Sequence, residues 1–428
     1  MSTLFVTGTW PAPLAEFTHG IAQRMRLLLS ALADTGEPLH LLAFGPPSAQ
    51  CGPAVGTALR GDFASLWGME LASVTVAARL ATPASGKGLW RDYLLPMTAH
   101  TRQPAFAPFA GAALARCVAE CVRAQGIDRL FIHRLAAHGP VSRSAVRLPA
   151  LMDLDDVEHL AFERLVRQPP HWGAKRLMLG WLPSLRTAER RAISSVDRAL
   201  VCSDLDRRYL AQRWGLHNVS VVPNAVRDMP VSPIPNAERM LFLGLHSYAP
   251  NRIAAEHLLQ HIWPRVRARR PAAELVIAGK GCELIAGFGA RTDGVTFAGY
   301  VPDLAGLYAQ TRIVLCPLLS GGGTRIKIIE AALQARPVVS TAIGAEGLAL
   351  RPDRHEIVIA DEPDTFADQI VALLEQPARA ETMGRAAREA ALGLYGEDTV
   401  RRAATAEFKK WIGSNRSARA AVERRTEK

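Results

Sequence analysis

The sequence predicts an α/β fold built from two doubly wound domains in tandem. Short apolar runs alternate with helical patterns along most of the 428 residues, and a chain of this length typically forms two or three domains. Strands that alternate with helices favour a mostly parallel sheet with helices on both faces. The alternation breaks at RDMPVSPIPNAE, residues 227–238, which contains three prolines. We interpret this segment as a linker between residues 1–226 and residues 239–395.

The strands expected in the two domains are short and apolar. In the first domain they cover residues 4–8, 38–44, 127–133, 148–156, 196–203 and 219–224. In the second they cover residues 239–244, 273–279, 295–299, 312–317, 337–341 and 356–360. Helical patterns lie between them, for example at 20–34 and 106–126. A last helix at 396–412 is expected to pack back on the first domain, and the basic tail 413–428 is expected to be disordered.

The net charge of the chain is +11, with an isoelectric point near 9.7. This excess favours an anionic partner such as a phosphorylated small molecule, an acidic membrane surface or nucleic acid. The six cysteines follow no zinc-binding spacing. The first residues have no basic region followed by an apolar run, and no stretch is long and apolar enough to span a membrane. We expect a cytoplasmic location.

The stretch SGGGTRIKIIEAAL, residues 320–333, is the most informative part of the sequence. Three glycines lead into a helical pattern that has Arg325 and Lys327 in its first turn, where the helix dipole disfavours cations. A bound diphosphate would explain them, because a helix start with glycine backbone is an anion site. Thr324 is expected to be the N-cap residue. The pattern of a P-loop is absent.

Lys327 and Glu330 are expected on one stripe of this helix, since they are about one turn apart. The carboxylate of Glu330 could then accept hydrogen bonds from ribose hydroxyls while the diphosphate lies at residues 321–327. Together these features describe the site of a nucleoside diphosphate. The residues alone leave a second interpretation open, in which the loop is an ordinary glycine turn and Lys327 and Glu330 form an ion pair on a solvated face.

The segment GGGTRIKIIEAALQARPVVSTAIGAEGL, residues 321–348, resembles the donor-binding segment of retaining glycosyltransferases of family 4, the group 1 glycosyltransferases. Residues 241–281 and 301–317 resemble other parts of the same C-terminal domain. The variant Gly-Gly-Gly-Thr-Arg-x-Lys is similar to that of bacterial exopolysaccharide sugar transferases. The resemblance implies the GT-B fold, in which two Rossmann-like domains have a cleft between them. It departs from the family at Gly322, where a first glutamate is common at the sugar end of the donor.

The resemblance also implies roles for individual residues. Glu330 would hold the ribose, and Arg325 and Lys327 would neutralise the leaving diphosphate. The other expected donor-binding residues are Gly20, Gly244, His246, Gly279, Gly281, Gly321, Gly322, Gly323 and Thr324. Transfer would retain the configuration at C1, with the departing phosphate taking the acceptor proton, so that no protein base is needed. No cofactor is expected besides the nucleotide-sugar substrate.

A histidine of the family that contacts the sugar lies at a place comparable to His133. This residue ends the expected strand 127–133, and His138 is an alternative. The residues alone are equally compatible with a hydrogen-bonded structural histidine.

The carboxylates of DLDD, residues 153–156, fit a metal-binding Asp-x-Asp pattern formed by Asp153 and Asp155. Asp155 and Glu158 also fit a capping box, which is the interpretation we favour, so that no metal is expected.

The segment 164–192 has seven basic residues and one acidic residue, interleaved with Trp172, Met178, Trp181 and Leu182. Such a composition is typical of a helix that lies on anionic lipid. An amphipathic core helix with a solvated basic face is the alternative. No recognition motif for nucleic acid accompanies the charge, and nucleic acid is not an expected partner.

The sequence therefore predicts a glycosyltransferase of hexosyl type that is retaining and metal-independent. Its expected donor is a nucleotide sugar, and its expected acceptor is a saccharide or lipid-linked saccharide of cell-surface polysaccharide. The sequence also allows a nucleotide-sugar epimerase of the same fold, although Gly322 lacks the carboxylate that elimination would use. A non-catalytic protein that binds nucleotide sugar remains the alternative from another class.

Overall fold

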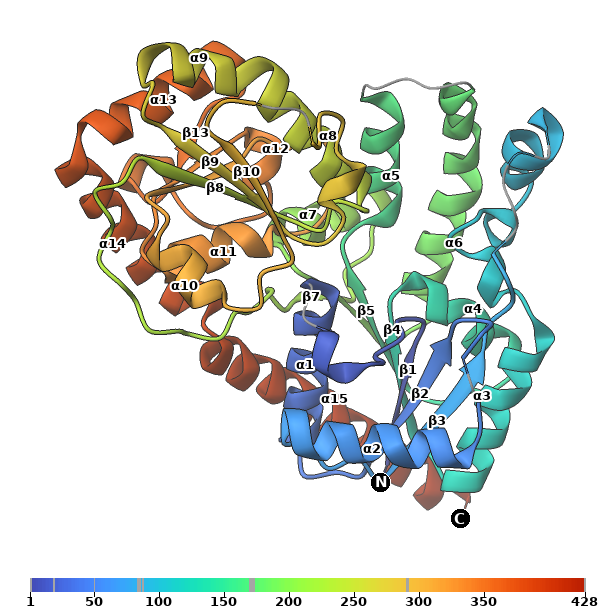
Figure 1. Ribbon diagram of the computed structural model, residues 1–428. Helices are drawn as coiled ribbons and strands as arrows, with labels where there is room; N and C mark the ends of the chain where they lie inside the picture. The colour runs from blue at the N-terminus through green and yellow to red at the C-terminus, as the bar shows by residue number, and fades with distance from the viewer. Residues whose placement is uncertain are drawn as a thin grey trace. The chain divides into compact units, whose positions relative to one another are not determined.

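The structure is a computed structural model that describes residues 2–17, 20–49, 51–82, 86, 88–168, 174–289 and 292–426. The predicted fold class is confirmed. Within these residues, strands form one sheet of seven and one sheet of six, and all the neighbouring strands that pair are parallel. Helices cover both faces of each sheet (Figure 1).

The chain divides into two compact units. The first consists of Met1–His159, His171–Val222 and Arg401–Lys428, and the second of Leu160–Pro170 and Pro223–Val400. The helix α5 (Glu158–Arg167) therefore passes from the first unit into the second. The helix α15 (Glu397–Thr426) passes from the second unit into the first.

The first unit has the strand order β3-β2-β1-β4-β5-β6-β7. Its strands are β1 (Thr3–Thr7), β2 (Leu39–Gly45), β3 (Ser73–Ala78), β4 (Arg129–His133), β5 (Ala150–Asp155), β6 (Arg198–Val201) and β7 (Val219–Val221). Its α-helices, besides parts of α5 and α15, are α1 (Gly20–Ala33), α2 (Pro53–Trp67), α3 (Ala112–Gln125), α4 (Leu135–Arg143), α6 (Leu182–Ser194) and α7 (Asp204–Trp214).

The second unit repeats this order as β10-β9-β8-β11-β12-β13. Its strands are β8 (Arg239–Leu243), β9 (Glu274–Ala278), β10 (Val295–Gly299), β11 (Ile313–Cys316), β12 (Val338–Ser340) and β13 (Val358–Ile359). Its helices are α8 (Ala249–His257), α9 (Trp263–Arg269), α10 (Leu304–Ala309), α11 (Ile326–Leu333), α12 (Ala342–Ala345), α13 (Pro363–Glu375) and α14 (Pro377–Tyr395).

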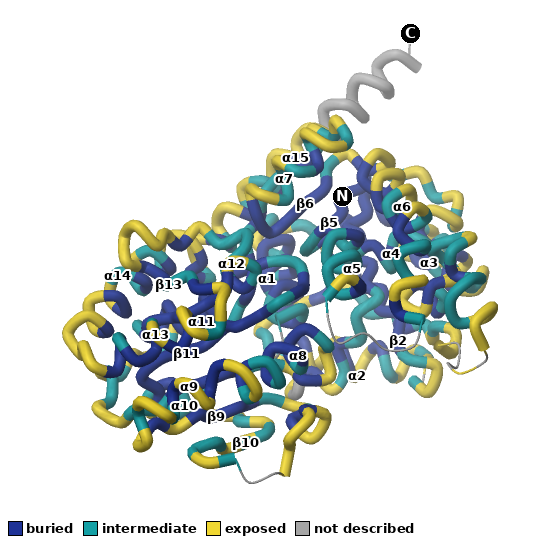
Figure 2. The backbone as a smooth tube through the Cα atoms, turned by 90° about the horizontal axis from the view of Figure 1, so that it is seen from above, coloured by how far each residue is buried: buried dark blue, intermediate teal, exposed yellow. Residues whose placement is uncertain are grey.

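This strand order decides where each unit can bind a ligand. The first strand of each unit lies in the middle of its sheet, and the order reverses between β1 and β4 and between β8 and β11. Open parallel sheets bind ligands at the carboxyl ends of the strands beside such a reversal. Figure 2 shows β5, β6 and β11 as buried, which matches their continuous apolar runs.

Three elements differ from the prediction. The helix expected at 106–126 begins only at Ala112, after a separate 3-10 helix at Ala107–Phe109. The strand β3 was not expected, because SVTVAA is a short run at the edge of the sheet and five of its six residues are not buried. The last helix continues to Thr426 rather than ending near residue 412, since the added residues are mostly alanine, arginine and glutamate, which favour helices. The side chains of α15 contact the first unit, where the ring of Phe408 packs 5.7 Å from that of Phe131.

Candidate functional site

The glycine loop follows β11 at the reversal of the second sheet and leads directly into α11. Gly321 has a φ of 118° and Gly323 a φ of 66°, both in the range that favours glycine. A Cβ added to Gly321 would lie 3.1 Å from Nη2 of Arg325. The loop therefore needs glycine here both for its backbone conformation and because a guanidinium group covers it.

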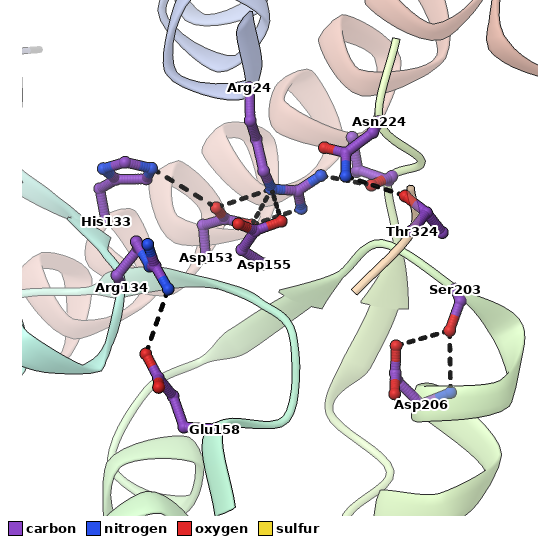
Figure 3. A network of polar contacts seen from close by, with 11 residues as sticks. Arg24, His133, Arg134, Asp153, Asp155, Glu158, Ser203, Asp206, Asn224 and Thr324 are labelled. Atoms are coloured by element: carbon purple, nitrogen blue, oxygen red, sulfur yellow. Dashed lines mark hydrogen bonds and ion pairs between the residues drawn. The ribbon is translucent and has the colours of Figure 1, made fainter. Parts of the chain in front are cut away.

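The helix α11 begins one residue later than the sequence indicated. Its N-cap residue is Arg325, which makes no side-chain capping hydrogen bond. Thr324 is not the N-cap residue, because its Oγ1 accepts a hydrogen bond of 2.9 Å from the amide of Asn224 (Figure 3). The first turn of α11 thus lacks a side-chain cap at its N-cap position, which is compatible with an anion there.

Arg325 is a buried cation with unused hydrogen-bonding capacity. Its side chain is 8% exposed, and Nη1 donates to the carbonyl oxygen of Gly323 at 2.7 Å. Among the described residues, its Nε and Nη2 have no hydrogen-bond partner. Buried polar groups in folded proteins are nearly always paired. These two nitrogens therefore point to an anionic ligand as the missing partner.

Lys327 is held close to the end of β8. Its Nζ donates to Oδ1 of Asn251 at 2.7 Å and lies 4.6 Å from the centre of the Phe242 ring. Burial is the main cause that lowers the pKa of Lys327 to about 8. Cys316 and Glu330 oppose this effect, and the charge of Arg325 adds to it. The pKa of this ammonium group therefore lies close to neutral pH, and an adjacent diphosphate would raise it again.

Glu330 is also buried, with 6% of its surface exposed. The hydroxyl of Tyr308, on α10, donates to its Oε2 at 3.4 Å. Burial raises the pKa of Tyr308, and the negative charge of Glu330 adds to this effect, so the phenol stays neutral and can donate. Lys327 and Glu330 are therefore not an exposed ion pair on a solvated face, which was the alternative interpretation of this stripe.

The ends of β8 and β9 approach each other closely. A Cβ added to Gly279, whose φ is 120°, would lie 1.8 Å from the carbonyl oxygen of Gly244. Gly244 itself faces Lys327, whose Nζ would be 3.2 Å from an added Cβ. Gly281 has a φ of 86° and precedes a short 3-10 helix, Cys282–Leu284. Three of the predicted glycines thus surround the same strand ends as Lys327.

His246 does not present a cation to this site. Its side chain is fully buried, and its Nε2 lies 3.1 Å from the carbonyl oxygen of Ala278, to which it donates as the neutral tautomer. Burial lowers the pKa of His246 to about 4. Because the single N–H of the neutral imidazole is donated to Ala278, only the main chain at this position is available to a phosphate group.

The predicted residues Gly20 and His133 belong to the first unit. Gly20 begins α1, and His133 ends β4 beside Thr7 of β1. The His133 ring is fully buried, with Nδ1 2.9 Å from Oγ1 of Thr7. Burial lowers the pKa of His133 to about 3, helped by the charge of Arg134, so the ring is neutral. His138 lies in α4, where its Nε2 is 2.9 Å from Oγ of Ser195.

The carboxylates of residues 153–156 are engaged by protein groups (Figure 3). Asp153 is fully buried, and Arg24 donates to both of its oxygens at distances of 2.5–3.1 Å. Nε of Arg24 also lies 3.5 Å from Oδ1 of Asp155. The predicted capping box is wrong, because the amide of Glu158 donates to Glu189 and its carboxylate pairs with Arg134. No cluster of His, Cys, Asp and Glu among the described residues is arranged to hold a metal ion.

The basic segment 164–192 is described except for residues 169–173, so Trp172 lies outside the described residues. Trp181 and Leu182 are buried at 5% exposure each, and Nε1 of Trp181 donates to the carbonyl oxygen of Tyr93. These two side chains are part of the core and are not available to a lipid. No described helix is both long and apolar enough to span a membrane.

Several residues of the site were not predicted. Asn251, Tyr308 and Asn224 hold Lys327, Glu330 and Thr324 respectively. Asn251 follows β8 by eight residues, and the motif of residues 320–333 contains no signal for any of the three. All three lie outside this motif, Asn224 and Asn251 far from it in the chain, and they meet it only after folding.

Residues 237–376 match the model of the family described as glycosyl transferases, group 1. This part of the chain is therefore similar to group 1 glycosyltransferase domains. It contains the glycine loop, Arg325, Lys327 and Glu330. No curated protein matches the sequence of the chain.

Solved structures resemble the whole chain at low sequence identity. Sucrose-phosphate synthase from Thermosynechococcus elongatus is 15% identical over 96% of this chain and 99% of that one, with a TM-score of 0.66. HepE from Anabaena, in complex with UDP and glucose, is 14% identical over 95% of this chain and 98% of that one, with a TM-score of 0.61. TarM of S. aureus is 9% identical over 97% of this chain and 98% of that one, with a TM-score of 0.66. The chain therefore has the same GT-B fold as these structures.

Proposed function

We propose that the protein is a retaining glycosyltransferase that takes a sugar from a nucleotide-diphosphate donor. The proposal rests mainly on Arg325, a buried cation beside a glycine loop at the reversal of the sheet, because two of its nitrogens have no partner within the part of the chain that the structure describes. Lys327 lies two residues later in the first turn of α11, so both positive charges lie at the same helix start. Their location within a group 1 glycosyltransferase domain makes a sugar nucleotide the best candidate for the missing anion.

The chemistry follows from these charges. Breaking the bond between C1 of the sugar and the phosphate oxygen leaves negative charge on the diphosphate. Preorganised cations stabilise this charge as it develops, which lowers the barrier. Arg325 and Lys327 would supply that stabilisation without a metal ion. The departing phosphate would take the proton of the acceptor hydroxyl on the face that it leaves, so the configuration at C1 would be retained.

The identity of the donor and acceptor is proposed from chemistry and from the relatives. HepE was solved with UDP and glucose, so we propose UDP-glucose as the first donor to try. We propose a saccharide or lipid-linked saccharide of cell-surface polysaccharide as acceptor. Because Trp181 and Leu182 are buried, attachment to an anionic membrane would use other side chains, such as the exposed Leu177 and Arg176 of the same segment.

A thermal-shift panel of UDP-, GDP-, ADP- and dTDP-sugars tests the proposal. Nucleotide sugars of one base should raise the melting temperature, and the rise should grow with the logarithm of ligand concentration above the Kd, because binding to the native state stabilises it by mass action. A chelator should leave both the shift and the transfer of sugar unchanged. Absence of a shift with every nucleotide sugar would contradict the proposal, and loss of activity that added metal restores would contradict metal independence. The anomeric proton coupling of the product, measured by NMR, tests retention.

Glu330→Gln is expected to weaken binding of the nucleoside diphosphate by about 10- to 100-fold. A charge-assisted hydrogen bond contributes about 1.5–3 kcal/mol, and the amide keeps the size of the side chain while removing its charge. Calorimetric titration with the diphosphate measures the effect. Tyr308→Phe is the matched control, since it removes the hydroxyl that contacts Glu330 but keeps the carboxylate. Equal affinities for wild type and Glu330→Gln would refute the ribose assignment.

A further inference from the structure

Arg164 connects two parts of the second unit that are far apart in sequence. It lies on α5, within the segment Leu160–Pro170 that belongs to this unit. Its Nη2 donates to Oε1 of Glu346 at 2.8 Å, and its Nη1 donates to Oε2 of the same carboxylate. The same Nη1 lies 3.3 Å from the carbonyl oxygen of Gly321. The carboxylate of Glu346 and the glycine loop are therefore separated by a single guanidinium nitrogen.

Glu346 and the glycine loop both follow the carboxyl ends of strands in the same sheet. It directly follows α12, whose N-cap Thr341 accepts a hydrogen bond from the amide of Gly344 at 3.0 Å. The hydroxyl of Thr341 donates to the carbonyl oxygen of Leu318, just after β11. Since β11 and β12 are neighbouring strands, α12 and the loop leave adjacent strand ends. Glu346 therefore lies close to the loop because β11 and β12 are neighbours in the sheet.

The order of charges along α11 indicates which end of the donor meets Glu346. Glu330 lies one turn inside the helix, and the cations Arg325 and Lys327 lie at its start. Gly321 precedes both cations in the chain, and the carboxylate of Glu346 lies beside it across Nη1 of Arg164. A ligand whose ribose is at Glu330 and whose diphosphate is at the cations would extend its sugar towards Gly321.

We propose that Glu346 is the carboxylate that accepts hydrogen bonds from hydroxyls of the donor sugar. Gly322 has no side chain, so the loop itself offers no carboxylate at this end of the site. Arg164 orients the carboxylate of Glu346, and 30% of the Glu346 side chain remains exposed to a ligand. Glu346 would then determine which sugar the protein accepts. This inference rests on the proposed function.

The test compares two ligands that differ only in the sugar. Calorimetry would measure the affinities of the nucleoside diphosphate and the nucleotide sugar for wild type and for Glu346→Gln. We expect the variant to bind the nucleotide sugar at least tenfold more weakly and the diphosphate within about twofold of wild type. Glu362→Gln, an exposed glutamate at the start of α13, is the matched control and should change neither affinity.

A rescue variant separates a lost carboxylate from a damaged loop. Adding Gly322→Glu to Glu346→Gln should recover part of the lost affinity for the nucleotide sugar, because a carboxylate returns to the same end of the site. Unchanged affinity for the sugar nucleotide in Glu346→Gln would overturn the proposal, and so would an equal loss for both ligands. If wild type binds neither ligand, the proposed function itself fails and the inference fails with it.

Discussion

Lys327→Ala is expected to lower the turnover number by about 10²- to 10³-fold, with a smaller effect on the affinity for the donor. The loss is of the size seen when one preorganised group that stabilises developing charge is removed. Lys327 is suited to this role because Asn251 and the Phe242 ring hold its ammonium group in place before any ligand binds. Steady-state kinetics with the nucleotide sugar that gives the largest thermal shift would measure kcat and KM separately.

The pH dependence of wild type and Lys327→Arg tests the same role. Burial lowers the pKa of Lys327 to about 8, so the side chain is positive below this pH and neutral above it. We expect kcat/KM, which reports the free enzyme, to fall as the pH rises through about 8. Arginine keeps its charge to a pH above about 12, so Lys327→Arg should remove this decline.

Lys409→Ala is the control, because Lys409 is exposed on α15. Its kinetics should match those of wild type at every pH. Turnover within about threefold of wild type in Lys327→Ala would exclude a role for the ammonium group at the leaving phosphate. If kcat/KM of Lys327→Arg still falls above pH 8 as in wild type, the fall is caused by the titration of another group.

The alternation of strands and helices could be predicted because it depends on patterns within a few residues. Continuous apolar runs marked β1, β4 and β11, which lie inside their sheets. The edge strand β3 has no such run, since an edge strand buries less of its surface. The anion site at the glycine loop and the start of α11 could also be predicted, because cations placed against the helix dipole are a feature of neighbouring residues.

The partners of these residues could not be predicted in the same way. Arg164 and Glu346 are 182 residues apart, and Lys327 and Asn251 are 76 residues apart. Asn251 and Lys327 meet because they follow β8 and β11, neighbouring parallel strands whose carboxyl ends lie at one edge of the sheet, whereas Arg164 reaches Glu346 from the helix α5. The sequence does not indicate which polar residues will touch in either case. The capping box at Asp155 and Glu158 was wrong for this reason, since Glu189 and Arg134 take the expected hydrogen bonds.

Arg24→Ala is expected to lower the free energy of unfolding of the first unit by about 3–5 kcal/mol. Removing one partner of a buried ion pair leaves the other charge without compensation, and this usually costs about that much. Burial alone would lower the pKa of Arg24, but Asp153 and Asp155 more than offset this, so its pKa is raised and it stays charged. Arg24 also donates to the carbonyl oxygen of Val222 at 3.0 Å. Urea denaturation of the full chain would measure the change.

The control and the double variant decide whether the ion pair is the cause. Arg60→Ala, at an exposed position of α2, should change stability by no more than about 0.5 kcal/mol. Arg24→Met with Asp153→Leu should recover much of the loss, because apolar side chains can replace a buried pair once both charges are gone. A loss below about 1 kcal/mol in Arg24→Ala would mean that Asp153 is not dependent on Arg24. Asp153 would then be open to another cation, and the Asp-x-Asp pattern would again have to be considered as a metal site.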